Sequence, residues 1–433
     1  MEWTFLPRVY GHYGIAGERR GQVDLRDLRV SAERLNDTLE KMAEIGRTPG
    51  GGVHRLALSD EDKQARDLFK KWLAEIEVEV RVDEMGNIFG LRPGRNVSLP
   101  PVMSGSHIDS QPKGGRFDGI YGVMATLEVL RTIQEKGIFT TRPIMIVDWT
   151  NEEGSRFSPA MAGSGVWAGK LERDWVYARK DLQGRKFGEE LQRIGYKGQE
   201  AAKRWPVHAY FELHIEQGPL LEEAGKRIGV PQGIVGISWY DVSIEGKANQ
   251  VGPTPMKGRN DALCAAAEMI LQVEALPAQM GGQLVATVGE IHNFPNSRNI
   301  IPGQVQFTVD LRSWDDSQLD RAGKELQIHF LKIAAQRGCP TRIEKIWNVE
   351  HTPFNETLVA RVGKVTEQIG YSSHTLVSGA GHDATYVSQI APAAMIFVPS
   401  IGGRSHVEVE NTRWEDCEAG ANVLLQCILQ TAL

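Results

Sequence analysis

The amino-acid sequence predicts a discontinuous α/β domain, with a mixed sheet and helices on its faces, that carries a small inserted α+β domain. Short β-like runs alternate with helical patterns in the first half of the chain and again after about residue 355, whereas the stretch between reads as strands of alternating polarity with two helices. The 433 residues also exceed one typical domain. We therefore expect a main domain at residues 1–236 and 350–433 and an inserted domain at residues 237–349.

The first part of the chain alternates between helical and strand periodicity. Apolar residues recur at helical spacing over residues 30–45, the run RTPGGG breaks this pattern, and a second helix is expected over residues 59–75 with Ser59 or Asp60 as its N-cap. Strand-like runs follow at EVEVRV, NIFGL, VMSGSH, RPIMIVDWT and HAYFELHIE. A helical pattern over residues 119–135 separates two of these runs, which is typical of a sheet covered by helices.

The inserted part has a different pattern. The runs WYDVSIEG, QLVATVGEIH and QVQFTVDLRSW alternate in polarity, so each is expected to be a strand with one buried face. In the last run the expected buried face consists of Val305, Phe307, Val309 and Leu311. Two helices are expected over residues 261–276 and 316–336. The α/β pattern then resumes with the runs HTLVSG and AAMIFVPS and a last helix over residues 413–430.

Composition excludes several classes of partner. The formal net charge is -6, and the 49 basic and 55 acidic residues are mixed along the chain, so neither a basic stripe for nucleic acid nor a polybasic membrane patch is expected. No signal-peptide pattern or long apolar run is seen, and we expect a cytoplasmic protein that contacts no membrane. The four cysteines are far apart, which favours buried thiols over a disulfide framework. Residues 1–29 receive no assignment.

The stretch GSHIDSQPKGGRFDG, at residues 105–119, concentrates a histidine and two aspartates where a strand should end. Residues i and i+2 of a strand face the same way, so His107 and Asp109 should share a side at the C-terminal edge of the sheet, where open α/β sheets bind ligands. A carboxylate at Asp109 would then fix the tautomer of the His107 imidazole. Asp118 comes just before a predicted helix, and by itself it reads as an N-cap.

Three further strand ends carry similar side chains. RPIMIVDWT runs into NEEGSRF, where the neighbouring Glu152 and Glu153 point in different directions, which suits one as a metal ligand and the other as a proton shuttle. FELHIEQGP places His214 on a strand and Gln217 at its Gly-Pro turn. PSIGGRSHVEVENT sets His406 in a loop after another strand. Taken singly, each of these side chains reads as structural.

Taken together, the strand ends indicate a metal centre. Their donors are nitrogen and oxygen atoms without thiolate, which suit Zn²⁺, Mn²⁺, Co²⁺ or Ni²⁺. A carboxylate that bridges two such ions is a known hydrolytic arrangement, so we expect two divalent ions per chain. The side chains concerned are His107, Asp118, Glu153, His214 and His406, with Glu152 as a further carboxylate.

The ordered motifs GSHIDSQPKGGRFDG, WTNEEGSRF, ELHIEQGPLLE, GPTPM, SRNIIPG, SGAGHDA and FVPSIGGRSH resemble those of the M20 metallopeptidase family. The resemblance is to its hydantoinase/carbamoylase branch, which includes N-carbamoyl-L-amino-acid hydrolases, β-ureidopropionases and allantoate amidohydrolases. It extends from about Ser31 to the C-terminus. It implies a binuclear-metal amidohydrolase that cleaves a C–N bond of a small carboxylate-bearing ureido or amide compound. It also implies that the main domain is catalytic and that the inserted domain is a ferredoxin-like lid and dimerisation domain.

The resemblance implies roles for individual residues. One ion would be held by His107, Asp118 and His214, and the other by Asp118, Glu153 and His406. Glu152 would be the general base, and Asp109 would support a metal-bound histidine. Four further residues would bind substrate: Asn299, Arg312, Gln217 and His382. The planar fork of an arginine suits the substrate carboxylate, which Asn299 and Arg312 would hold together.

One position departs from the family pattern. The family usually has a histidine in a lid segment A-H-A-G-P-T-P-M, where it stabilises the oxyanion, whereas this sequence reads KANQVGPTPM with Gln250 in that place. A glutamine amide donates a hydrogen bond, but it carries no charge and cannot shuttle a proton. Three explanations stay open: the substrate needs less charge stabilisation, a different residue acts, or the protein is a feeble enzyme.

Two classes of function therefore remain. The first, favoured by the intact Glu152 and the full ligand set, is an amidohydrolase, and its rival among enzymes is an N-acyl-amino-acid amidase or dipeptidase. The second is a metal-binding homologue without useful turnover. Metal-dependent release of ammonia from N-carbamoyl amino acids would distinguish them. The expected partners are a small carboxylate-bearing substrate and a second copy of the chain, bound through the inserted domain.

Overall fold

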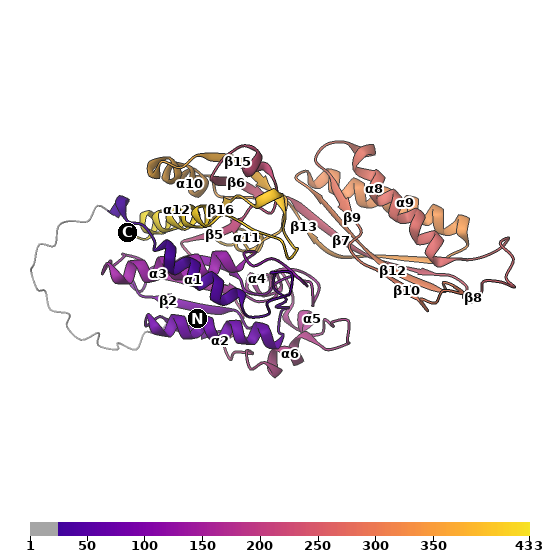
Figure 1. The fold of residues 1–433 in the computed structure, drawn as a ribbon, viewed down its shortest axis with the longest axis horizontal. Coiled ribbons are helices and arrows are strands. Elements are labelled where there is room, and N and C mark those ends of the chain that lie inside the picture. Colours follow the sequence, from indigo (N-terminus) through magenta and orange to yellow (C-terminus); the bar gives the residue numbers. More distant parts are fainter. Residues whose placement is uncertain (1–24) are drawn as a thin grey trace, which may run out of the picture. The chain divides into compact units, whose positions relative to one another are not determined.

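The computed structural model describes residues 25–433, and the chain divides into two compact units (Figure 1). The first comprises the described residues up to Val230 together with Asn355–Thr375 and Tyr386–Leu433. The second comprises Pro231–Phe354 and Leu376–Thr385. The inserted domain expected at residues 237–349 falls within the second unit, and its boundaries and its role as a lid stay predictions.

The first unit combines a large sheet with helices. Three of its elements, β6, β15 and α11, continue into residues of the second unit. The helices and turns of 3₁₀ type are η1 (Leu25–Asp27), α1 (Ala32–Ala43), α2 (Asp60–Glu75), α3 (Ile120–Glu135), α4 (Ala162–Trp167), α5 (Arg173–Tyr177), α6 (Phe187–Arg193), α7 (Leu220–Glu223), α10 (Glu356–Ile369), α11 (Ala384–Val387), η2 (Ile401–Gly403) and α12 (Trp414–Ala432). The strands are β1 (Glu79–Val82), β2 (Ile88–Arg92), β3 (Val102–His107), β4 (Ile144–Trp149), β5 (Ala209–Ile215), β6 (Ile228–Ile234), β15 (Ser373–Ser378) and β16 (Ala393–Val398).

The large sheet is mixed. Its order is β1-β2-β4-β3-β5-β16-β6-β14, where β14 is Thr352–Pro353, and β15 also pairs with β6. The central strands β4, β3, β5 and β16 are parallel, whereas β1, β2, β6 and β14 pair antiparallel. Every residue of the four central strands is buried. Parallel strands buried on both faces read as continuous apolar runs, which is why IMIVDW and AAMIFV stand out in the sequence.

Helices cover both faces of this sheet. On one face, Ser104 of β3 and Thr126 of α3 share a hydrogen bond of 2.9 Å between their hydroxyls. Ile146 of β4 pairs with Ser104, so Trp149, three residues further along, points to the opposite face. There its ring packs against Trp167 of α4 at 5.2 Å between centroids. With both faces covered, the loops that follow the parallel strands are where polar side chains gather.

The three helices expected in the first part of the chain are confirmed as α1, α2 and α3. Ser59 caps α2 by accepting a hydrogen bond from the Asp62 N–H. The N-cap of α3 is Gly119, with φ of 67° and no side-chain cap, so the interpretation of Asp118 as an N-cap is wrong. The short helices α4, α5 and α6 have too few turns to show a helical period and were not predicted.

The second unit has its own antiparallel sheet, of order β10-β12-β7-β13, and β9 pairs with β12. With β9 and β10 counted as one interrupted strand, the strands of this sheet and the two helices follow the order strand, helix, strand, strand, helix, strand. The elements are β7 (Gly236–Glu245), β8 (Asn249–Gln250), α8 (Ala262–Met280), β9 (Val285–Thr287), β10 (Ile291–Phe294), β11 (Ile300–Ile301), β12 (Gln304–Ser313), α9 (Asp316–Arg337), β13 (Thr341–Val349) and β14 (Thr352–Pro353). β8 and β11 form a separate two-stranded sheet.

The run QLVATVGEIH, expected as one strand, is split into β9 and β10. Both pair with the same edge of β12, and Thr287 and Ile291 face Asp310 and Phe307. Three residues of this edge therefore stand opposite two of β12. An extra residue of this kind is a β-bulge, and Gly289 lies inside it. The alternation of polarity was predicted, but this interruption was not.

The expected buried face of β12 is confirmed. Val305, Phe307, Val309 and Leu311 are buried, and the residues between them are exposed or half-buried. They pack in one apolar cluster with side chains of α8 and α9, which lie side by side (Figure 1). The rings of Phe307 and Phe330 meet edge to face at 5.8 Å between centroids. Among the described residues, no helix is both long and apolar enough to cross a membrane.

The alternation along β12 predicts opposite effects for neighbouring substitutions. Phe307→Ala should lower the free energy of unfolding by about 3–5 kcal/mol, because a buried ring is replaced by a cavity. The adjacent Gln306 is exposed, so Gln306→Ala should change it by less than about 0.5 kcal/mol. Urea unfolding of both variants measures the difference. Equal losses would show that the two faces of β12 are not distinguished by burial.

Candidate metal centre

Asp118 places its two carboxylate oxygens among three imidazoles. Its Oδ1 lies 3.1 Å from His214 Nε2 and 3.6 Å from His107 Nε2. Its Oδ2 lies 3.2 Å from His406 Nε2. Only 6% of Asp118 is exposed. The two oxygens of one buried carboxylate thus face separate sets of imidazole nitrogens.

Two groups of donor atoms share Asp118. One consists of His107, Asp118 and His214, the other of Asp118, Glu153 and His406, and within each group the donor atoms lie within 4.8 Å of one another. In the second group, Glu153 Oε2 is 3.5 Å from His406 Nε2. Three nitrogen and oxygen donors around one point match a divalent-metal site that keeps a position open for other ligands. The residues present therefore fit divalent metal ions.

The tautomers of two histidines suit the binding of a metal ion. His107 Nδ1 lies 2.9 Å from the Asp109 carbonyl oxygen, and His214 Nδ1 lies 2.9 Å from the Ile215 carbonyl oxygen. A carbonyl oxygen only accepts hydrogen bonds, so each Nδ1 carries the hydrogen. In the neutral form of each ring, Nε2 then carries the lone pair on the side of Asp118, and in His214 it accepts a 3.0 Å hydrogen bond from the Gly119 N–H.

The carboxylate of Asp109 has a different contact from the one expected. Its Oδ1 is 3.7 Å from His107 Nδ1, which is too long for a hydrogen bond. The two carboxylate oxygens instead accept the backbone N–H groups of Glu152 at 3.1 Å and Glu153 at 3.3 Å. Asp109 thus orients His107 through its carbonyl group and holds the turn after β4 through its side chain. Burial raises the pKa of this carboxyl to about 7, despite His107 nearby.

The neighbouring glutamates of this turn face different histidines. Glu152 Oε2 lies 3.5 Å from His107 Nε2, whereas Glu153 faces His406 and accepts a 2.8 Å hydrogen bond from the Gln111 amide. Both glutamates are buried. The backbone turns sharply on either side of them, with positive φ at the residue before and at the glycine after. Adjacent side chains of an extended strand would point to opposite faces, so the turn is what brings both to one site.

Two glycines of the run KGGRFDG allow the loop to approach its neighbours. A Cβ atom at Gly119, whose φ is 67°, would lie 2.2 Å from the His107 ring. A Cβ atom at Gly115 would lie 1.9 Å from the carboxyl group of Glu410. Any side chain at either position would displace a residue of the site. Steric crowding therefore explains why glycines occupy positions 115 and 119.

The charges of the cluster depend on one another. Burial opposes ionisation of Asp118, but its three imidazole neighbours outweigh burial and hold the pKa of this carboxyl well below its usual range. Burial lowers the pKa of His406, while Glu153 and Asp118 raise it, for a net rise to about 9. The pKa of His107 is also raised, because nearby carboxylates outweigh its burial. The site thus stabilises positive charge among its carboxylates, which is what a cation site requires.

Gln217, expected to bind substrate, lies at the same cluster. Its Nε2 donates a 2.9 Å hydrogen bond to Asp118 Oδ2 and lies 3.2 Å from His406 Nε2. Its Oε1 is buried and has no hydrogen-bond partner among the described residues. A buried acceptor without a partner is costly, so this oxygen is suited to a donor on a bound molecule.

The other expected substrate residues belong to the second unit. Gln250 of β8 pairs with Ile300 of β11, and the next N–H along the chain, of Val251, donates to the Asn299 carbonyl at 3.0 Å. This pairing brings Gln250 and Asn299 side by side. The Oε1 of Gln250 accepts a hydrogen bond from the Gly252 N–H. The amide nitrogen is then the group of Gln250 that can donate outward.

Arg312 and His382 also lie in the second unit. The guanidinium of Arg312 donates hydrogen bonds from Nε and Nη2 to the Asp310 carboxylate, and the shortest is 2.7 Å. Its Nη1 donates a 3.0 Å hydrogen bond to the Gly379 carbonyl, in the motif SGAGHDA. His382 of that motif is buried, with Nε2 3.0 Å from Ser378 Oγ. Two motifs that are far apart in the sequence therefore meet at Arg312.

Three residues at the metal centre were missed by the sequence reasoning. Gln111 binds Glu153, Ser405 Oγ lies 3.1 Å from Asp118 Oδ2, and Glu410 accepts hydrogen bonds from the Phe117 and Asp118 N–H groups. All three occur in runs that carry predicted ligands. Glu410 is a carboxylate four residues after His406, which could have marked it as part of the site. The sequence did not show, however, that this residue is buried while most residues around it are exposed.

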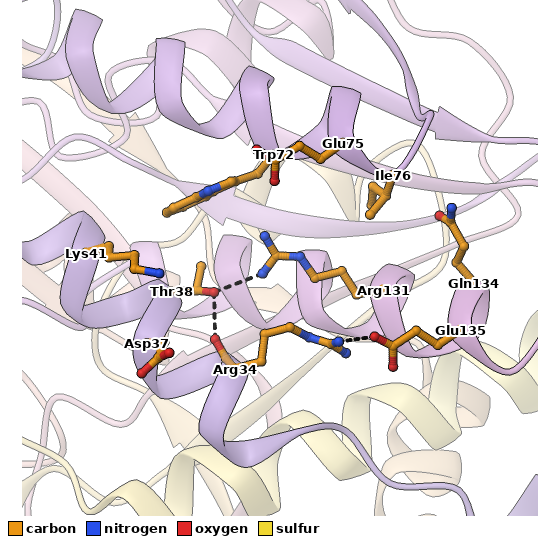
Figure 2. Close-up of a pocket in the computed structure, with 10 residues that line it drawn as sticks. All are labelled: Arg34, Asp37, Thr38, Lys41, Trp72, Glu75, Ile76, Arg131, Gln134 and Glu135. Carbon is orange, nitrogen blue, oxygen red and sulfur yellow. Dashed lines mark hydrogen bonds and ion pairs between the residues drawn. The ribbon is translucent and has the colours of Figure 1, made fainter.

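A cavity of about 410 Å³ lies elsewhere in the first unit, between α1, α2 and α3 (Figure 2). Arg131 extends into it, donates a hydrogen bond to Thr38 Oγ1 at 2.9 Å and lies over the Trp72 ring. The remaining lining residues are Arg34, Asp37, Lys41, Glu75, Ile76, Gln134 and Glu135. None of the residues expected at the metal centre lines this cavity.

Comparison with known proteins places the chain in a family. The profile of peptidase family M20/M25/M40 matches residues 103–430. The N-carbamoyl-L-amino-acid amidohydrolase of Rhizobium meliloti is 44% identical over 404 residues, which cover 93% of this chain and 97% of the relative. The allantoate amidohydrolase of Bacillus subtilis is 33% identical over 400 residues, 92% of this chain and 97% of the relative.

Solved structures agree with these relatives. The crystal structure of an amidase of the hydantoinase/carbamoylase family from Burkholderia vietnamiensis has a TM-score of 0.93 at 47% identity, and the match covers 94% of this chain and 98% of the other. The structure of AtUAH in complex with (S)-hydroxyglycine has a TM-score of 0.91 at 29% identity and covers 94% of this chain and 100% of the other. The chain therefore belongs to peptidase family M20/M25/M40, a metal-dependent family, and is a hydrolase of C–N bonds other than peptide bonds.

Proposed function

We propose that the protein hydrolyses the C–N bond of a small N-carbamoyl-amino-acid-like compound at a centre of two divalent ions. The observation that carries the proposal is the position of Asp118, whose oxygens face two separate donor groups. His107 and His214 would complete one site, and Glu153 and His406 the other. The donor set suits Mn²⁺, Zn²⁺, Co²⁺ or Ni²⁺. When bound, such ions would supply a lowered pKa for an attacking water molecule and polarisation of the scissile carbonyl.

Glu152 is the general base of the proposed reaction. It belongs to neither donor group, yet its Oε2 lies 3.5 Å from His107 Nε2 and only 6% of the residue is exposed. A carboxylate in this position can take a proton from an attacking water molecule and pass it to the leaving nitrogen. The turn held by Asp109 fixes its backbone, so its position does not depend on a flexible loop.

Arg312 and Asn299 are proposed to bind the substrate carboxylate. Asp310 and the Gly379 carbonyl fix the orientation of the Arg312 guanidinium, so the arginine need not be ordered when substrate binds. An arginine fork matches a carboxylate in shape and charge. The complex of AtUAH with (S)-hydroxyglycine, a small hydroxy-bearing amino acid, agrees with this class of ligand. Gln217 and His382 are proposed as further binding residues.

Gln250 is proposed to donate a hydrogen bond to the substrate oxygen that gains negative charge. Its Oε1 is already used by the Gly252 N–H, so the amide nitrogen is the group that it offers. A neutral donor stabilises an oxyanion less than a protonated histidine does. The proposal therefore includes a substrate with a modest need for charge stabilisation.

The second unit is proposed as a lid and as the surface of a homodimer. Its helices α8 and α9 expose large apolar side chains, namely Leu271 at 59%, Ile328 at 58% and Leu331 at 57%. Apolar groups gathered on adjacent helices are typical of a surface that another chain covers. A cytoplasmic location is part of the same proposal, and the four unpaired cysteines agree with a reducing compartment.

Metal removal tests the proposed function. Protein stripped with a chelator should release no ammonia from N-carbamoyl-L-amino acids, and activity should return with Mn²⁺, Co²⁺, Ni²⁺ or Zn²⁺ at two ions per chain. Asp118→Ala should lose both ions and all activity, because its carboxylate serves both groups. Elemental analysis and an ammonia assay measure the two quantities. Hydrolysis of N-acetyl amino acids alone would favour an N-acyl-amino-acid amidase. A protein that retains no ions after incubation with metal salts would contradict the proposed metal centre.

The two neighbouring glutamates should respond differently to the same change. Glu152→Gln should keep both ions but lower kcat by at least ~10²-fold, because the amide cannot accept a proton. The matched variant Glu153→Gln should bind one ion more weakly, because an amide is a poorer ligand than a carboxylate. Metal content and kcat are measured on both proteins. If Glu152→Gln kept full activity, the general base would be another residue.

The role of Gln250 is tested with a histidine in its place. Gln250→His should raise kcat/KM on N-carbamoyl-L-amino acids that need a stronger donor and leave turnover of the native substrate unchanged or lower. An oxyanion donor is worth roughly 2.7–4 kcal/mol, so the gain could reach ~10²-fold. Both proteins are compared on one panel of ureido, formyl and acyl amino acids. Changes below about threefold on every compound would show that position 250 takes no part in the chemistry.

A further inference from the structure

Glu410 connects two loops that carry metal-binding residues. It is 3% exposed, although it follows a loop of mostly exposed residues. Its Oε1 accepts hydrogen bonds from the Phe117 N–H at 3.1 Å and the Asp118 N–H at 3.0 Å. Its Oε2 lies 2.7 Å from Ser405 Oγ. One carboxylate thus holds the backbone of Asp118 and the residue next to His406.

Ser405 extends this connection to the Asp118 side chain. Its Oγ lies 3.1 Å from Asp118 Oδ2 and 2.7 Å from Glu410 Oε2. A hydroxyl has one proton and can donate to only one of two carboxylates. Ser405 therefore links the carboxylates of Asp118 and Glu410, so a shift of one carboxylate changes the contacts of the other.

We propose that Glu410 is a positioning residue of the metal centre, which fixes Asp118 and the His406 loop together so that both donor groups form at once. The inference rests on the two-ion site proposed above. Asp118 alone belongs to both groups, and His406 comes from a segment far later in the chain. Gln217 contacts the side chains of Asp118 and His406, whereas Glu410 holds the backbone of Asp118 and the side chain of Ser405, next to His406. Without Glu410, two backbone N–H groups beside Asp118 would lose their buried acceptor.

Gly115 provides an independent way to move this carboxylate. A Cβ atom there would lie 1.9 Å from the Glu410 carboxyl carbon, and the backbone of Gly115 is not in the left-handed region. An alanine is therefore compatible with the backbone at this position but not with the present place of the carboxylate. Gly115→Ala should displace Glu410 while leaving every hydrogen-bonding group of the protein intact.

Three variants test the role by metal affinity, measured by competition with a coloured chelator on metal-free protein. Glu410→Ala should weaken binding of the ions by about 10- to 100-fold, the usual cost of losing a group that orients metal ligands. Glu410→Gln should stay within about threefold of wild type, because its amide oxygen still accepts from both N–H groups and its amide nitrogen can donate to Ser405. The control Glu408→Gln, in the same loop, should match wild type.

A double substitution separates positioning from a general loss of structure. Gly115→Ala alone should weaken metal binding about as much as Glu410→Ala, and the pair together should be no weaker than Glu410→Ala alone, because the clash has disappeared. Thermal unfolding of the metal-free proteins identifies variants that fail to fold. If Glu410→Ala does not fold, the comparison of Gly115→Ala with Glu410→Gln decides the matter.

Several results would overturn the inference. Wild-type affinity in Glu410→Ala, or in a folded Gly115→Ala, would show that the carboxylate does not position the ligands. Equal losses in Glu410→Gln and Glu410→Ala would show that its charge acts instead of its hydrogen bonds. The wild-type titration tests a different point: a wild-type protein that binds no ions would remove the metal centre itself.

Discussion

The contact of the Asp118 carboxylate with three imidazoles is the constraint on which the rest of the first unit depends. A buried carboxylate is costly unless opposite charge and hydrogen bonds surround it. Here His107, His214 and His406 supply them, and Gln217 adds an amide donor. His107 lies on the same stretch of chain as Asp118, His214 and Gln217 share a second stretch, and His406 follows the last strand. The fold has to bring these three separate segments together at one carboxylate.

The parallel part of the sheet meets this requirement. The neighbouring strands β4, β3, β5 and β16 run in the same direction, so their carboxyl ends lie along one edge. The loop or turn after each strand then contributes a residue to the cluster, as is usual for open α/β sheets. The buried apolar strands provide the rigid base, and the glycine-rich loops provide the close approach. Gly119 shows the limit of that approach, because its hydrogen atom faces the His107 ring.

Much of this arrangement could be predicted from the sequence, because the signals were local. Apolar runs mark buried parallel strands, helical spacing marks α1 to α3, and alternation marks the buried face of β12. Donor residues at the end of such a strand, such as His107, or shortly after it, such as Glu153, are then placed by topology. The roles of Asn299, Arg312 and Gln250 came instead from a family resemblance. No periodicity or spacing indicates them.

The parts that could not be predicted depend on backbone paths within loops. The Asp109 side chain was expected against His107, but the strand ends at His107, and beyond it the alternation of faces no longer applies. The bulge that separates β9 from β10 leaves no clear mark on polarity. Glu410 and Gln111 resemble ordinary polar loop residues until the loop is folded. Contacts of this kind require the positions of two segments at once, which a single sequence pattern does not contain.

The place of β16 in the sheet has a consequence for biosynthesis. β16 lies between β5 and β6 although it is the last strand of the chain, and His406 follows it closely. A ribosome has therefore made the whole inserted unit and nearly all of the rest before the middle of the sheet can close. Domains usually fold as units, with N-terminal parts first, but here the central sheet of the first unit cannot be completed until β16 has been made. A nascent chain that lacks β16 and the loop after it has an open sheet and an incomplete set of donor residues, so both candidate donor groups can be complete only after this segment has been made.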